Sequence, residues 1–261
     1  MELAGQLRQR LAAGHTALGS FVGEFRTPAI ATLMGQVDLD FLLVDTEHGS
    51  LNPEDVAGHI VAAKSAGLTP WVRVSTVDRT EITRVLDAGA EGIMVPMVRS
   101  VEDARKAVAV SKYPPRGQRG AHFLRPHNNY QPPTDIGAYM NQANARLFTI
   151  LQVETLEAAA QVDELAAVEG VDMLYIGPGD LSIAMGYPGQ VGHPQVLEVV
   201  ERMAQSCMAH GKFAGSHCND PAMVAELVGR GIQVIGLGAV LRMLQVGMEL
   251  VTAQARQGLK D

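Results

Sequence analysis

The sequence predicts a (β/α)8 TIM barrel, and three features support that fold class. Eight short apolar runs recur along the 261 residues, and helical patterns separate them. Single-domain α/β barrels commonly reach this length. No G-x-G-x-x-G motif follows the first apolar run, which disfavours a dinucleotide-binding version of the alternative, an open doubly wound sheet. We therefore expect one barrel domain over residues 1–261.

The expected strands are short apolar runs, as is typical of parallel strands that are covered on both faces. In chain order they are Ala17–Val22, Phe41–Asp45, Trp71–Val74, Ile93–Pro96, Phe148–Val153, Leu174–Ile176, Phe213–Gly215 and Val234–Leu237.

The segments between these strands carry helix start and stop signals. Asn52 and Asp220 each precede a proline, which is typical of a helix N-terminus, and glycine follows several of the segments. The expected helices include Pro53–Ala66, Arg79–Ala88, Val101–Ser111, Leu156–Val168, Gln195–His210 and Pro221–Arg230. A further helical segment at the C-terminus is expected to serve in subunit contacts.

One long stretch, residues 113–145, interrupts the alternation and is rich in Pro, Arg, His and Asn. Stretches of this length are commonly functional or disordered. Because it follows the fourth strand, we expect it to lie over the carboxyl-end face of the barrel. Its Arg116, Arg119 and Arg125 could contact an acidic substrate, and a packed subunit-contact loop is the alternative.

Composition excludes several classes of partner. The formal net charge of −7 and the scattered basic residues argue against a nucleic-acid surface. No apolar run of 18 residues is present, so no membrane span is expected. Residues 1–8 are typical of a polar helix rather than a signal peptide, and Cys207 and Cys218 make no disulfide framework. We expect a cytoplasmic protein.

Active sites of such barrels lie at the carboxyl ends of the strands. Several polar side chains occur at those ends in this sequence, together with one aromatic residue at the end of the first strand. They are Phe21, Asp45, His48, Arg73, Gln152, Glu154 and Asp180.

Glu154 and Asp180 follow two successive strands. A strand, a crossover helix and a parallel strand bring both strand ends to the same side of a sheet, so the two carboxylates are expected side by side. Carboxylate oxygens suit a hard divalent cation. The alternative for Asp180 is a helix cap. The preceding Gly177–Gly179 turn could offer backbone N–H groups to a substrate carboxylate at a helix start.

His48 and Arg73 are the expected catalytic side chains. His48 is a candidate general base, with a purely structural histidine as the alternative. Arg73 lies within an apolar strand, and it points into the barrel if its neighbours point outward. There it could meet the metal or a substrate anion, or it could form an ion pair that closes the barrel floor. A Schiff-base mechanism is disfavoured because Lys212 precedes its strand and the other lysines lie on helices or the tail.

Several long motifs, in order along nearly the whole chain, resemble the HpcH/HpaI aldolase family of metal-dependent pyruvate aldolases, and in particular 4-hydroxy-2-oxoheptanedioate aldolases and related sugar-acid aldolases. The motifs occupy residues 41–48, 72–74, 86–90, 93–97, 113–120, 152–154, 176–182, 185–187 and 192–194.

The resemblance implies a TIM barrel assembled as a hexamer whose subunits exchange C-terminal helices. It implies reversible aldol cleavage of a 4-hydroxy-2-oxo acid to an aldehyde and pyruvate, or a close 2-oxo acid such as hydroxypyruvate. It also implies that Glu154 and Asp180 bind Mg²⁺, Mn²⁺ or Co²⁺. The turn Gly238–Val240 departs from many relatives, which carry an Asp there, and this concerns the aldehyde side of the site.

The resemblance further implies a role for each matching side chain. His48 is the base, Arg73 steadies the enolate, and Gln152 together with the Gly179–Asp180 backbone contacts pyruvate. Asp87 raises the basicity of His48. Asp45, on the same strand end as His48, is the alternative partner for that histidine. Phe21 and Arg119 complete the expected substrate contacts.

Two other functions stay open from the sequence. The same enolate chemistry serves carbon–carbon lyases that act on acyl-CoA thioesters, and the arginines of residues 113–145 could contact a nucleotide tail. A non-catalytic barrel scaffold is the other alternative, although the convergence of His, Arg and two carboxylates on one rim disfavours it.

Overall fold

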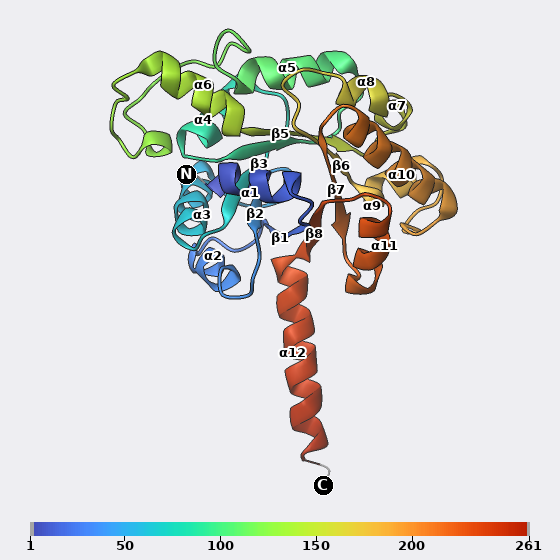
Figure 1. Ribbon diagram of the computed structural model, residues 1–261. Helices are drawn as coiled ribbons and strands as arrows, with labels where there is room; N and C mark the ends of the chain where they lie inside the picture. Colours follow the sequence, from blue (N-terminus) through green and yellow to red (C-terminus); the bar gives the residue numbers. More distant parts are fainter. Residues whose placement is uncertain (1–2, 260–261) are drawn as a thin grey trace.

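The computed structural model describes residues 3–259 and contains a closed barrel of parallel strands (Figure 1). The strands are β1 (Ala17–Val22), β2 (Phe41–Asp45), β3 (Thr69–Arg73), β4 (Gly92–Val95), β5 (Phe148–Val153), β6 (Met173–Ile176), β7 (Phe213–Cys218) and β8 (Val234–Ala239). Because β8 pairs with β1, the sheet has no open edge. The predicted (β/α)8 barrel is confirmed, and the open sheet is excluded.

The end of β7 was predicted too early. The strand continues beyond Gly215 through Ser216, His217 and Cys218, which stay in register with β8. Ladder hydrogen bonds join backbone groups, so a strand can continue after its apolar side chains end. This extension carries polar side chains to the carboxyl-end rim.

Helices alternate with the strands as predicted. Asn52 begins the third helix with a capping box that includes Asp55. The predicted helix over residues 156–168 is broken at Gln161, and the helix predicted from Pro221 starts as a 3-10 turn. The helices are α1 (Leu3–Ala12), α2 (Ala29–Met34), α3 (Pro53–Ser65), α4 (Arg79–Asp87), α5 (Val101–Ser111), η1 (Pro126–Asn128), α6 (Ile136–Arg146), α7 (Leu156–Ala160), α8 (Val162–Ala166), α9 (Pro178–Ala184), α10 (Pro194–Ala209), η2 (Pro221–Met223), α11 (Val224–Gly229) and α12 (Val240–Gln257).

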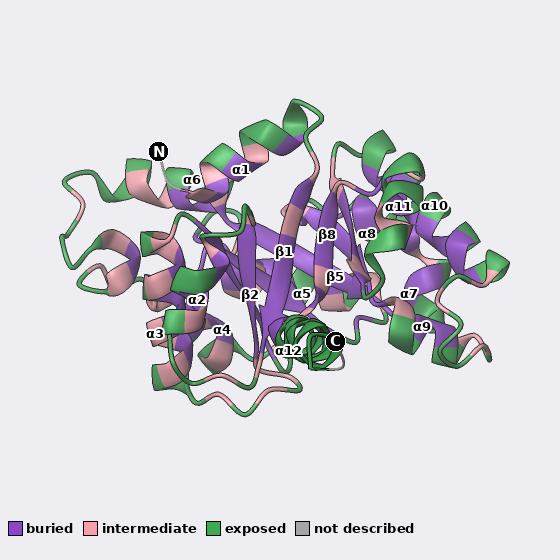
Figure 2. Ribbon diagram, turned by 90° about the horizontal axis from the view of Figure 1, so that it is seen from below, coloured by how far each residue is buried: buried purple, intermediate pink, exposed green. Residues whose placement is uncertain are grey.

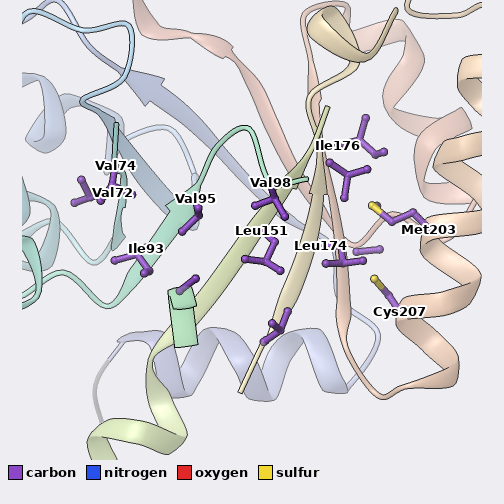
Figure 3. Close-up of a cluster of buried hydrophobic side chains, with 14 of the residues drawn as sticks. Val72, Val74, Ile93, Val95, Val98, Leu151, Leu174, Ile176, Met203 and Cys207 are labelled. Carbon is purple, nitrogen blue, oxygen red and sulfur yellow. The ribbon is translucent and has the colours of Figure 1, made fainter. Parts of the chain in front are cut away.

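Two apolar clusters hold the barrel together. One fills the space between the strands and the helices around them, where Val72, Val74 and Ile93 are buried (Figure 3). The other fills the barrel interior around Phe41 and Trp71, whose rings stack at 4.5 Å. Each fully buried large apolar side chain contributes roughly 1.5–3 kcal/mol. Since Val72 and Val74 face the helices, strand alternation turns Arg73 into the barrel, as predicted.

The long stretch of residues 113–145 lies at the amino ends of the strands, and the expectation that it covers the carboxyl-end face was wrong. It follows α5 and not β4 directly, so it leads back to the start of β5. Lys112 anchors it there by donating to the carbonyl of Leu147, immediately before β5. Figure 1 shows α6 on the opposite side of the barrel from α12.

The C-terminal helix α12 extends away from the barrel (Figure 1). Val240 is its one buried residue, and residues 241–257 are exposed; Figure 2 shows the helix end-on in the colour of exposed residues. Leu250 and Val251 are 58% and 64% exposed. Across residues 3–259, no helix has both the length and the apolar character that a membrane crossing requires.

Candidate active site

A cavity of about 420 Å³ opens at the carboxyl ends of the strands. It is the place where the sequence predicted the polar strand ends to converge. Its walls come from β1, β2, β3, β5, β7 and β8, from the segments that follow β2, β6 and β7, and from α10 and α11. The lining residues are Phe21, Asp45, His48, Arg73, Gln152, Gly177, Pro178, Gly179, Asp180, Val191, Leu197, Val200, Ser216, His217, Cys218, Asn219, Asp220, Met223, Leu227 and Ala239.

Arg73 and Asp45 form a two-pronged ion pair in this cavity. They are Cα partners in the β2–β3 register. Arg73 donates from Nε to Oδ1 of Asp45 at 2.9 Å and from Nη2 to Oδ2 at 2.6 Å. Burial acts to raise the pKa of Asp45, but the hydrogen bonds and charge of Arg73 outweigh it and hold that pKa below its ordinary value. The guanidinium plane is therefore fixed in orientation.

The pair continues into the residues that end β5. Arg73 Nη1 donates to Oε1 of Gln152 at 3.4 Å, and the Gln152 amide donates to Oε2 of Glu154. The other carboxylate oxygen of Glu154 accepts from the backbone N–H of Met97 at 2.7 Å. A Cβ at Gly177 would lie 2.5 Å from Glu154 Oε2, so only glycine leaves room for this carboxylate.

The buried Glu154 is surrounded by negative charge. The pKa of Glu154 is raised to about 7. Burial is the largest cause, the carboxylates of Glu47 and Asp180 add to it, and the Met97 N–H and Arg73 oppose it. Asp180 is exposed and lies in the first turn of α9. Three acids near one another, with one of them buried, form a region in which a cation is favourable.

The oxygen donors here fit a hard divalent cation. Mg²⁺ commonly uses one or two protein carboxylates together with waters and substrate oxygens, and Glu154 and Asp180 supply such a pair. Within residues 3–259, no group of three or more His, Cys, Asp and Glu side chains could hold a metal by itself. The residues therefore fit an ion that takes its other ligands from water and substrate.

His48 lies on the rim, and its side chain is 68% exposed. Its ring Nε2 is 3.9 Å from Oε2 of Glu47. The backbone N–H of His48 donates to Asp45 at 3.4 Å, so Asp45 supports the turn and not the imidazole. The ring is accessible to a substrate in the cavity, as a general base must be.

Glu47 is a site residue that the sequence reasoning missed. Its Oε2 lies 3.1 Å from Nη1 of Arg73. Burial is the largest cause that raises the pKa of Glu47, with Arg73 opposing it. Its place was the available signal, because Glu47 lies two residues after the end of β2, in the turn that also carries His48.

Phe21 forms part of the cavity wall, as expected for a substrate contact. The Arg73 guanidinium carbon lies 5.4 Å from the centre of its ring, and the His217 ring meets it edge-on at 5.0 Å. A Cβ at Gly236 would lie 2.8 Å from the Phe21 ring, so this glycine makes room for the aromatic side chain. Gly179 also lines the cavity, and a Cβ added there would meet no atom within 4 Å.

Asp87 and Arg119 lie away from this cavity within the chain. Asp87 ends α4, five residues before β4 begins, and therefore lies at the amino-end side of the barrel. Arg119 is buried, pairs with Asp87 at 3.0 Å and stacks on Tyr113 at 4.6 Å. The structure does not bring either residue near His48, because α4 carries the chain from one end of the barrel to the other.

Fold and cavity together define a (β/α)8 barrel with a polar site at the carboxyl ends of its strands, where enzymes of this fold carry their active sites. The chain belongs to the HpcH/HpaI aldolase/citrate lyase family, whose model matches residues 19–245. It is an aldolase-type carbon–carbon lyase, as the resemblance of its motifs implied.

Sequence relatives and solved structures agree on this family. The chain is 34% identical over 238 residues to the 2-keto-3-deoxy-L-rhamnonate aldolase of Salmonella gallinarum. The aligned region covers 90% of this chain and 87% of the relative. The HpcH/HpaI aldolase of Desulfitobacterium hafniense has a TM-score of 0.87 and 32% identity, covering 98% and 96% of the two chains. The citrate synthase SbnG has a TM-score of 0.87 and 30% identity, covering 98% and 99%.

Proposed function

We propose that this chain is a divalent-metal-dependent aldolase that reversibly cleaves 4-hydroxy-2-oxo acids to an aldehyde and pyruvate, or a close 2-oxo acid such as hydroxypyruvate. The observation that carries the proposal is the hydrogen-bonded series Asp45–Arg73–Gln152–Glu154 at the cavity. It orients the Arg73 guanidinium through Asp45 and holds the Glu154 carboxylate beside it through Gln152. Relatives named 2-keto-3-deoxy-L-rhamnonate aldolase support the substrate class.

Glu154 and Asp180 are the proposed holders of Mg²⁺, Mn²⁺ or Co²⁺. When bound, such an ion supplies Lewis-acid polarisation of the substrate carbonyl, a contribution of several kcal/mol. The remaining chemistry comes from side chains of the chain itself.

In the cleavage direction, His48 takes the proton of the 4-hydroxyl group, directly or through a water. The C3–C4 bond then breaks, the aldehyde leaves, and the electron pair of that bond passes into the enolate of the 2-oxo acid. Arg73 stabilises the negative enolate oxygen, because its guanidinium is already oriented by Asp45. A proton returned to C3 completes pyruvate. Gln152 and the backbone of Gly179 and Asp180 orient the substrate carboxylate.

A role for Asp87 in raising the basicity of His48 requires a second copy of the chain, since the two lie at opposite ends of one barrel. Within the chain, the Asp45 carboxylate is occupied by Arg73 and by backbone N–H groups. Glu47 is the acid that approaches the imidazole, and we assign it the supporting role when no second copy is present.

We also propose a homo-oligomer, a hexamer by family resemblance, in which α12 packs on another subunit. Helix α12 has 18 residues and exposes apolar side chains such as Leu250 and Val251 to water. Exposed apolar surface of this kind is typical of a protein–protein contact. In a (β/α)8 barrel the final helix normally covers the last strand, whereas α12 leaves the barrel after Val240. A partner's helix would bury these side chains.

Exchange of the pyruvate methyl protons with deuterium, followed by NMR, tests the function directly. We expect exchange in the presence of Mn²⁺ or Mg²⁺, loss of exchange with EDTA, and recovery when the metal is restored. Exchange that survives thorough chelation contradicts the metal role, and no exchange under any condition contradicts the aldolase itself.

The alternative of an acyl-CoA lyase loses its main support. Residues 113–145, which hold Arg116, Arg119 and Arg125, lie at the amino-end side of this chain. Arg73 is the one Lys or Arg side chain among the described residues that line the cavity. A nucleotide tail would find no basic contact there.

A further inference from the structure

The cavity has two halves of different character. Arg73, Gln152 and Asp180 line the half that the enolate chemistry uses. The other half is formed by the end of β7, the segment after it, α11, the side of α10 and the loop before α10, and the proposed mechanism gives these residues no role. Its lining is an apolar wall with a polar corner: Val191, Leu197, Val200, Met223 and Leu227 form the wall, and Ser216, His217, Asn219 and Asp220 form the corner.

The polar corner contains a hydrogen-bonded pair. His217 Nε2 and Asn219 Oδ1 are 3.0 Å apart. Because an amide oxygen only accepts, Nε2 carries the proton. Burial lowers the pKa of His217, with the Asn219 hydrogen bond opposing it, so the ring is neutral near pH 7. In this tautomer Nδ1 is an acceptor, and no described residue bonds to it.

The imidazole is held in place on two sides. Its edge-on contact with Phe21, at 5.0 Å between ring centres, restricts rotation on one side. Asn219 restricts it on the other. A histidine that lines a cavity and is restrained in this way loses little conformational entropy when it binds a hydroxyl group.

Charge in this half disfavours an anionic aldehyde. Among the described lining residues, the one Lys or Arg is Arg73, whose guanidinium is engaged by Asp45 and Glu47. The half around His217 adds the carboxylate of Asp220. An aldehyde that carries its own carboxylate would bring a second negative charge to a wall with no cation to meet it.

We propose that His217, positioned by Asn219, is a specificity-determining residue that selects a small uncharged aldehyde bearing a hydroxyl group, with the apolar part of that aldehyde on the Val191–Leu227 wall. The inference rests on the proposed aldolase function and adds the class of aldehyde to it. The hydroxyl donates to Nδ1 of the neutral ring. An aldehyde without that hydroxyl leaves the acceptor unpaired, and an aldehyde with a carboxylate meets Asp220.

The experiment compares three aldehydes with pyruvate in the aldol-addition direction, using the full-length protein and Mn²⁺. The aldehydes are lactaldehyde, propanal, which lacks only its hydroxyl group, and succinic semialdehyde, which carries a carboxylate. We expect the wild-type kcat/KM for lactaldehyde to exceed that for propanal by roughly tenfold, as one well-placed neutral hydrogen bond can provide. Succinic semialdehyde should be the poorest of the three.

Two variants test the residues. His217→Leu should bring the lactaldehyde-to-propanal ratio close to one, and Asn219→Ala, at an exposed position where folding is not at stake, should lower it partially. Met223→Leu on the apolar wall is the matched control, because it should alter both aldehydes alike and preserve their ratio. Pyruvate methyl exchange needs no aldehyde, so it reports separately on the enolate half in every variant.

The outcomes separate the two claims. Wild-type protein that exchanges the pyruvate methyl but prefers succinic semialdehyde overturns the aldehyde inference alone. So does an unchanged ratio in both His217→Leu and Asn219→Ala while exchange continues. Absence of methyl exchange in the wild type removes the proposed function and this inference with it.

Discussion

Buried charges occur at both ends of the barrel. Those at the amino end are paired with opposite charges or carbonyls, whereas the acids at the carboxyl end lie beside other acids. At the amino end, Lys112 donates to the carbonyls of Asn144 and Leu147 and to the Asp172 carboxylate at 2.7–3.0 Å. Arg8 donates to the same carboxylate. At the carboxyl end, Glu154 is crowded by other acids beside an open cavity.

The charges at the amino end stabilise the fold, and those at the carboxyl end form the candidate active site. At the amino end each charge meets an opposite charge or a carbonyl, so the network ties α1, α5 and β5 together. At the carboxyl end, negative charges outnumber positive ones, and their repulsion lowers the stability of the folded protein. A cation that binds there relieves this repulsion. The predictions below test this contrast, from the largest expected effect to the smallest.

Glu154→Gln should produce the largest change, a loss of kcat/KM of roughly 10³-fold or more, since it removes a proposed metal ligand and the charge of the site. In metal-free buffer the variant should be at least as stable as the wild type, because a buried carboxylate beside other acids is gone. Added Mn²⁺ should raise the Tm of the wild type and not that of the variant. A marked loss of metal-free stability would instead place Glu154 with the structural charges.

Arg73→Lys should lower kcat/KM by about 10²–10³-fold, because an ammonium cannot reproduce the two-pronged contact with Asp45 while facing the enolate. The matched control is Arg8→Lys at the amino end. That variant should lower the urea midpoint through lost packing on Phe148, where the guanidinium lies 4.3 Å from the ring centre, and should retain turnover. Equal turnover in Arg73→Lys and the wild type would refute the role of Arg73.

Lys112→Met should lower the free energy of unfolding by about 3 kcal/mol. Asp172 pairs with Arg8 and Lys112, and the variant keeps only the pair with Arg8. Urea unfolding measures this loss. Lys106→Met, which removes an exposed pair with Glu102, serves as the control and should leave the midpoint unchanged. A similar midpoint for both variants would show that the amino-end network contributes no more than a surface ion pair.

Charge on α12 should change assembly and not the barrel. Leu244→Glu combined with Val251→Glu places two acids on exposed apolar positions, and we expect a smaller particle by analytical ultracentrifugation. Gln254→Glu, on the same helix, controls for charge alone and should keep the wild-type mass. A wild-type chain that sediments as a monomer contradicts the proposed subunit contact outright.

The sequence alone determined the fold class and most of the rim. Apolar runs with helical patterns between them predict a parallel sheet, their number favours a barrel, and residues that end successive parallel strands must meet at one end. This reasoning placed Asp45, Arg73, Gln152 and the Gly177–Asp180 turn on one rim, and in the structure they line one cavity. It also predicted that Arg73 points into the barrel, because side chains alternate between the two faces of a strand and the sequence shows apolar residues on either side of Arg73.

Only the tertiary structure decided what depends on strand register and on the path of the long connections. The Asp45–Arg73 partnership and the approach of Glu47 follow from the alignment of β2 and β3, which no run of residues encodes locally. The location of residues 113–145 and of Arg119 was predicted wrongly, because a connection belongs to the barrel end where its preceding helix finishes. Position in the chain specifies which residues follow a strand, whereas packing specifies which of them share a cavity.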